Sequence, residues 1–179
     1  MSASSTIRDA FTEQTENAPF FSSNGFPKST GSGALQTPFY VDDKGHFNFG
    51  YGLDITVNRV GPFLSWLKTS GLSSADQGVL TTQLSLYLSG KITLSTLNST
   101  IGLRDWRPIA QGVMDNYYAD KVDGSSGLSG DLGQYGFSAS AITNLQANSP
   151  HIWAALEDLK YNAPNAIYDQ RPTITNAQG

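Results

Sequence analysis

The feature that most limits the fold is a change in the spacing of apolar residues near Thr56. Before it, apolar and polar residues alternate in short segments, which predict strands over 39–41, 46–49 and 51–55. Residues 42–45, Asp-Asp-Lys-Gly, separate the first two segments as the turn of a β-hairpin. After Thr56 the apolar residues recur at helical spacing through most of the remaining chain. A sheet this small buries little surface alone, so it must pack on the helices, and we expect a cleft at that junction.

Caps and glycines divide the helical part into separate elements. We predict a leading helix over 5–17, followed by helices over 60–70, 73–89, 94–101, 106–117, 138–145 and 150–159. Residues 18–37 and 121–136 are rich in Gly and Ser, which predicts loops. The expected fold class is therefore α+β and predominantly helical. We expect one domain over 1–179, with a leading helix (5–17), a β-hairpin region (38–56) and a helical lobe (57–165).

Composition excludes several classes of function. The chain has no cysteine, which removes disulfides, thiolate catalysis and cysteine-based zinc sites. With only His46 and His151, we expect no metal centre and no other cofactor. A net charge of -4 without a basic stripe argues against a nucleic-acid partner. Residues 1–16 lack the apolar core of a signal peptide and no segment has the length of a membrane span, so we expect a soluble protein. We also expect a monomer.

Residues 39–56 contain the densest set of polar side chains that could take part in catalysis. Asp42 precedes Asn48 by six residues and Asp54 follows it by six, with Gly50 and Gly52 between Asn48 and Asp54. A carboxylate and a small polar side chain on a hairpin can activate a water, and an opposing carboxylic acid completes the set that hydrolyses a glycosidic bond. The alternative for either aspartate is local turn chemistry or helix capping. The alternative for Asn48 is an outward polar residue between Phe47 and Phe49 of an alternating strand.

The order of these features resembles the phage-type lysozymes and the pesticin-like muramidases. In that family a glutamate-bearing helix precedes a hairpin in which a polar residue is followed by Gly-x-Gly, as in residues 48–52 here. The phage pattern places an aspartate at the position of Asp42, and the pesticin pattern places it at Asp54. Residues 155–162 also resemble a buried late helix of the family that ends in Tyr-Asn. Three departures stand out: Asn48 replaces a threonine, the loop before the hairpin is longer, and the chain ends soon after the Tyr-Asn helix. Either the chain is a fragment or its core closes differently.

The resemblance implies a peptidoglycan-degrading muramidase, a lysozyme-like glycoside hydrolase that cleaves the β-1,4 bond between N-acetylmuramic acid and N-acetylglucosamine. Glu16 would be the proton donor, and Glu13 is the alternative. A position at the end of a helix suits an acid, because the negative end of the helix dipole disfavours ionisation. Asp54 is the favoured base and Asp42 the alternative, while Asn48 would orient the attacking water.

The substrate-binding residues implied by this arrangement are Tyr51, Gly50, Gly52 and His46. Trp66, Trp106 and Trp153 are further candidates for stacking on a sugar, but Trp106 and Trp153 match helical core stripes, which favours the core for these two.

Two other functions stay open, a catalytically degenerate peptidoglycan-binding module and a lytic transglycosylase. Domains of this family occur as phage endolysins, bacteriocin killing domains and secretion-system effectors. The resemblance therefore implies synthesis in the cytoplasm and action on the bacterial cell wall, in the periplasm, after release or export. The expected partner is the peptidoglycan glycan strand, with a cognate immunity protein if the chain is a bacteriocin or effector.

Overall fold

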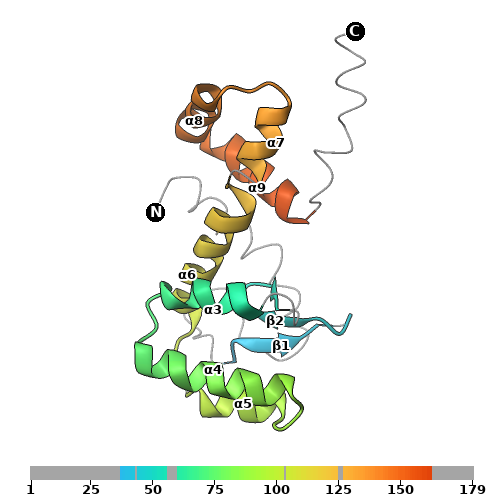
Figure 1. Ribbon diagram of the computed structural model, residues 1–179, viewed down its shortest axis with the longest axis vertical. Coiled ribbons are helices and arrows are strands. Elements are labelled where there is room, and N and C mark those ends of the chain that lie inside the picture. Colours follow the sequence, from blue (N-terminus) through green and yellow to red (C-terminus); the bar gives the residue numbers. More distant parts are fainter. Residues whose placement is uncertain (1–36, 43, 56–59, 103, 125–126, 163–179) are drawn as a thin grey trace. The chain divides into compact units, whose positions relative to one another are not determined.

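The structure is a computed structural model, and it describes residues 37–42, 44–55, 60–102, 104–124 and 127–162 (Figure 1). These residues belong to two compact units, which are described separately: a hairpin unit (described residues 37–116) and a helical unit (described residues 117–162). The leading helix expected over 5–17, with Glu13 and Glu16, lies outside the described residues. The expectation of a single domain stays a prediction.

The hairpin unit contains a three-stranded antiparallel sheet in the order β1-β2-β3. Strand β1 covers Phe39–Val41, β2 covers Phe47–Phe49 and β3 covers Leu53–Asp54. The predicted strands are confirmed in place, but the third is shorter than expected. Gly50 and Gly52 have φ angles of 58° and 89°, so the chain turns between β2 and β3 instead of extending through Tyr51. This left-handed backbone is readily available only to glycine.

One face of the sheet is aromatic and packs on the helices. Phe39 and Phe49 are buried, with ring centroids 5.0 Å apart, and Phe49 lies 5.1 Å from Phe63 and 6.4 Å from Trp106. Phe47 extends this face by contacting Tyr87 at 4.7 Å. A register slip of one residue would move the phenylalanines to the other face, so their burial determines the pairing of the strands.

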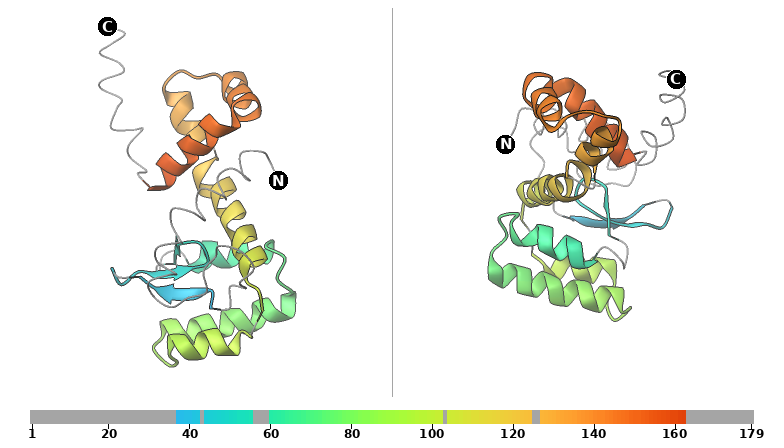
Figure 2. Two further views of the ribbon diagram at one scale, coloured as in Figure 1. Left: turned by 180° about the vertical axis from the view of Figure 1, so that it is seen from behind. Right: turned by 45° about the horizontal axis from the view of Figure 1, so that its top comes forward.

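Four helices complete the described part of the hairpin unit: α3 (Val60–Lys68), α4 (Ser74–Leu88), α5 (Leu94–Thr100) and α6 (Arg107–Tyr117), whose last residue begins the other unit. Helices α4 and α5 run side by side in all views (Figure 2). Helix α5 also holds the edge of the sheet. The Asn98 side chain accepts a hydrogen bond from Phe39 N (3.2 Å) and donates one to Phe39 O (2.9 Å), so it substitutes for a neighbouring strand.

The helical unit contains the π-helix η3 (Tyr118–Val122) and helices α7 (Leu128–Gln134), α8 (Ala139–Asn148) and α9 (Pro150–Asn162). The helices predicted from Ser138 and Pro150 are confirmed. The loop predicted over 121–136 is wrong, because α7 lies within it. Its sequence has low helix propensity, but Leu128 and Leu132 are one turn apart and bury in a cluster with Ile142 and Trp153. Tertiary burial therefore outweighs the local preference.

Candidate functional site

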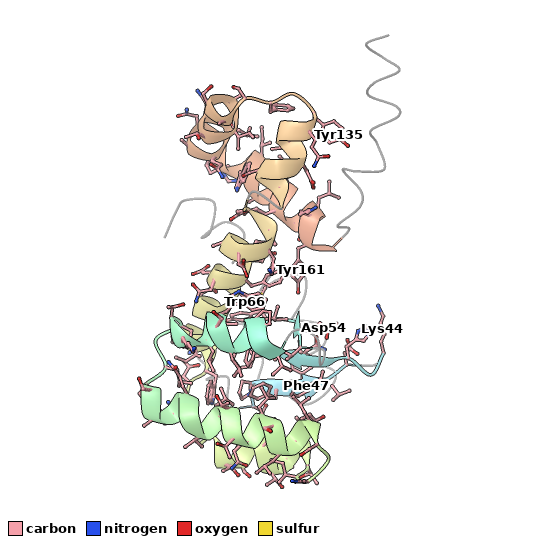
Figure 3. The ribbon with its side chains drawn as sticks, in the orientation of Figure 1. Lys44, Phe47, Asp54, Trp66, Tyr135 and Tyr161 are labelled. Carbon is pink, nitrogen blue, oxygen red and sulfur yellow. The ribbon has the colours of Figure 1, made fainter. Side chains whose placement is uncertain are left out.

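The polar face of the hairpin sheet brings together two of the predicted site residues. Asn48 on the central strand is the register partner of Tyr40 on one side and Asp54 on the other. Side chains directly opposite each other on neighbouring strands have Cβ atoms about 4.5–5.5 Å apart. Tyr40, Asn48 and Asp54, here called the polar row, therefore stand side by side. In Figure 3, Asp54 and Phe47 lie on opposite sides of the sheet, with Lys44 at the hairpin tip.

The Asp54 carboxylate is the least satisfied group of the polar row. Its Oδ1 atom is buried, and no residue that the structure describes gives this carboxylate a hydrogen bond or an ion pair. Buried polar atoms in folded proteins nearly always have a partner, so an exception calls for an explanation such as a catalytic role. Asp54 is the register partner of Asn48 and lies two residues after Gly52. Its position and its free acceptor atoms suit a base that takes a proton from water.

Asp42 is in the opposite condition, because both of its carboxylate oxygens are occupied within the hairpin turn. Oδ1 accepts from the backbone N–H of Lys44 (3.0 Å) and of His46 (2.8 Å). Oδ2 lies 3.3 Å from Asn48 Nδ2 and 3.2 Å from His46 Nδ1. Burial alone would raise the pKa of Asp42, but the His46, Asn48 and Lys44 hydrogen bonds and the His46 charge together hold it below its usual value. Asp42 is therefore a stable anion engaged in turn structure.

Asn48 is almost completely buried, with 4% of its surface exposed. Its amide nitrogen donates to Asp42 Oδ2 (3.3 Å) and to the His46 backbone oxygen (2.9 Å). Both amide protons are thereby used, and no group in the described ranges donates to Asn48 Oδ1. Asn48 is therefore not an outward-facing, exposed residue of the strand, which was the alternative considered above.

Gly50, predicted as a substrate-binding residue, lies close to helix α6. A Cβ atom at Gly50 would lie 2.6 Å from Ala110 Cβ on α6, so the absent side chain is explained by packing. Tyr51 is buried at 9% exposure, which leaves little of its ring available for stacking on a sugar. The His46 side chain is 51% exposed next to Asp42.

The tryptophans occupy the core. Trp106 and Trp153 are buried as predicted, and Trp66, a candidate for sugar stacking, is buried as well. The helical unit adds a buried carboxyl group that sequence reasoning overlooked, Glu157, whose Oε1 accepts from Trp153 Nε1 at 3.0 Å. The four-residue spacing of Trp153 and Glu157, which places them on one face of a helix, could have indicated this contact from the sequence. Tyr40 was also overlooked, although strand alternation places it on the same face as Asp42.

In the described part of the chain, no three His, Cys, Asp or Glu side chains are grouped closely enough to hold a metal ion. Within the same part, no helix is both long and apolar enough to cross a membrane. The helical unit has an open groove of about 480 Å³, lined by uncharged residues of α8 and its flanks: Phe137, Ser140, Ala141, Asn144, Leu145 and Ser149.

Comparison with known proteins finds no match. No protein-family model, no curated protein and no solved structure is significantly similar to this chain.

Proposed function

We propose that the chain is a muramidase that hydrolyses the β-1,4 bond between N-acetylmuramic acid and N-acetylglucosamine in peptidoglycan. The observation that carries the proposal is the Asp54 carboxylate, which has a buried oxygen, no partner among the described residues, and Asn48 as its neighbour across the sheet. Asn48, Gly50, Gly52 and Asp54 have the spacing of the polar residue, the two glycines and the aspartate in the pesticin-like hairpin. The proposed acid is Glu16, which lies outside the described residues and rests on the resemblance alone.

The proposed reaction is a direct displacement by water. Asp54 takes one proton of the attacking water, while Asn48 Oδ1 accepts a hydrogen bond from the other and orients the oxygen lone pair. The water oxygen forms a bond to the anomeric carbon as the glycosidic bond breaks. The leaving oxygen takes its proton from Glu16, so the products are one new reducing end, whose anomeric configuration is inverted, and one new non-reducing end. An inverting pair of this type stands roughly 6.5–9.5 Å apart, which leaves room for the water.

Asp54 fits the role of base better than Asp42 does. A base must have an oxygen free to receive the proton, and Asp42 has both oxygens occupied by hydrogen bonds from the turn. The same hydrogen bonds lower the pKa of Asp42 and so make it a weaker base. Asp54 receives no such hydrogen bond from the described residues.

The test is the release of fragments from purified, insoluble peptidoglycan, analysed by mass spectrometry. Asp54→Asn and Glu16→Gln are compared with the parent and with Asp120→Asn, a control that removes an exposed carboxylate of η3. We expect reducing muramic ends from the parent and the control, and a loss of roughly 100-fold or more in each site variant. A folded Asp54→Asn variant with activity within threefold of the parent would rule out this base.

Two other results would overturn the proposal itself. Anhydromuramic ends from the parent would assign the chain to the lytic transglycosylases, in which no water is activated. Sedimentation of the parent with peptidoglycan, without release of any soluble fragment, would assign it to the degenerate binding modules.

A further inference from the structure

Resting on the proposed function, we propose that Asp42 is a positioning residue that acts through Asn48. It holds the Asn48 carboxamide in the one orientation that leaves Oδ1 available to the attacking water. The two aspartates at equal spacing from Asn48 then have different tasks: Asp54 receives the proton, and Asp42 determines which end of the amide faces the water.

The contacts of Asn48 permit one orientation of its amide. Among the described residues, the two atoms that the Asn48 amide nitrogen reaches are Asp42 Oδ2 (3.3 Å) and His46 O (2.9 Å), and both are acceptors. Only the NH₂ end can satisfy them, because a carboxamide oxygen has no proton to donate. In a flipped amide, Asn48 Oδ1 would face Asp42 Oδ2 and His46 O, and both hydrogen bonds would be lost. The orientation follows from the chemistry of the neighbours.

Asp42 is itself held by the turn, so it can impose that orientation. The backbone N–H groups of Lys44 and His46 donate to Oδ1, at 3.0 Å and 2.8 Å. The turn is closed by Asp42 N to His46 O (3.0 Å) and by Gly45 N to Asp42 O (3.1 Å). Oδ1 is thus committed to the backbone, and Oδ2 is directed at Asn48 and at His46 Nδ1. The carboxylate is a fixed acceptor.

A carboxamide depends on a fixed neighbouring acceptor for its orientation more than a hydroxyl does. The two ends of an amide differ in hydrogen-bonding character but hardly in shape, so packing alone distinguishes them poorly. A hydroxyl donates and accepts through one atom and rotates to suit its partners. The dependence on Asp42 should therefore be strong with asparagine at position 48 and weak with threonine there.

The most informative variant is Asp42→Asn. It can preserve the hydrogen bonds that Oδ1 accepts from the turn, and it replaces the acceptor that faces Asn48 with a donor. The new side-chain oxygen can still accept from the Lys44 and His46 backbone N–H groups, which maintains the turn. An NH₂ group then replaces Oδ2 and faces Asn48 Nδ2, so the original orientation of the Asn48 amide keeps only the His46 O acceptor, while a flipped amide gains a donor from position 42. We expect kcat to fall roughly 10-fold to 100-fold, the range for a misplaced reacting group, with KM within about twofold. Lys44→Ala is the control, since it retains the backbone N–H, and it should leave kcat unchanged.

A double-mutant cycle separates positioning from direct catalysis. If Asp42 acts through Asn48, then Asp42→Asn has little further effect, within about twofold, when Asn48 is already alanine. In the Asn48→Thr background its effect should be clearly smaller than in the parent. An equal loss from Asp42→Asn with and without the Asn48 side chain would show that Asp42 acts on the reaction directly and would overturn the inference. Unchanged activity of the single variant would overturn it as well.

A second readout does not depend on activity. The side-chain NH₂ resonances of Asn48, assigned by NMR, should shift in Asp42→Asn and remain in place in Lys44→Ala. If the parent releases no muramic fragments, the proposed function fails, and these resonances still decide whether Asp42 orients Asn48. Resonances that do not move in Asp42→Asn would refute the orientation.

Discussion

Replacing Gly50 by alanine tests whether the hairpin depends on its close approach to α6. Gly50 has a φ angle of 58°, and a Cβ atom there would lie 2.6 Å from Ala110 Cβ. Methyl groups do not approach this closely, so either the turn or α6 must move. The substitution adds one methyl group directly after β2, two residues from Asn48.

Two costs add at this position. Left-handed backbone costs an L-residue about 1–2 kcal/mol, and forcing a methyl group into a packed core costs about 1–3 kcal/mol. We therefore expect Gly50→Ala to lower the free energy of unfolding by about 2–5 kcal/mol. Gly45→Ala is the matched control, because Gly45 also has positive φ, 83°, but nothing lies within 4 Å of its Cβ position. The control should lose only the backbone term, about 1–2 kcal/mol.

The assay is urea unfolding followed by far-UV circular dichroism, with parent and variants compared at one pH. A third variant isolates the clash: in an Ala110→Gly background, the loss caused by Gly50→Ala should fall to about that of Gly45→Ala, about 1–2 kcal/mol. Equal losses for Gly50→Ala and Gly45→Ala in the parent background would refute the packing argument. The Gly50 position would then be explained by backbone geometry alone.

Three further results are expected. Asp54→Asn should lower activity but leave the free energy of unfolding within about 1 kcal/mol of the parent value in thermal unfolding, because no hydrogen bond or ion pair to a described residue is lost; a marked loss of stability would mean that Asp54 is structural. Asn98→Ala should lose about 2–4 kcal/mol in urea unfolding, because it leaves both backbone groups of Phe39 unpaired, whereas the exposed Asn144→Ala should lose less than about 1 kcal/mol. The pKa of Asp42 is lower in the folded state than in the unfolded state, so its contribution to stability is complete above about pH 4 and is lost as the pH falls below that value. Asp42→Asn should accordingly flatten the stability profile below about pH 4, and a profile parallel to that of the parent would contradict this assignment.

Much of the local structure could be predicted from the sequence, because it depends on neighbours along the chain. Alternation around Asn48 predicts the strands, and the Ser73 and Ser138 side chains begin α4 and α8 by accepting from backbone N–H groups, as capping residues do. Spacing also placed Trp106 and Trp153 in the core correctly. Each of these features is determined within a few residues.

The structure was needed wherever a residue depends on a distant part of the chain. Helix α7 forms because Leu128 and Leu132 meet a distant tryptophan, Trp153, which no local propensity reveals. Asn98 secures β1 from 59 residues away.

The candidate site divides in the same way. Sequence spacing identified Asp42, Asn48 and Asp54 together, and it left open which aspartate serves as the base. The difference between the two carboxylates comes from strand register and turn hydrogen bonds: these occupy both oxygens of Asp42 and leave Asp54 without a partner among the described residues. Residue type and spacing determine which chemical groups are near one another, but only folding determines which of them remain free to react.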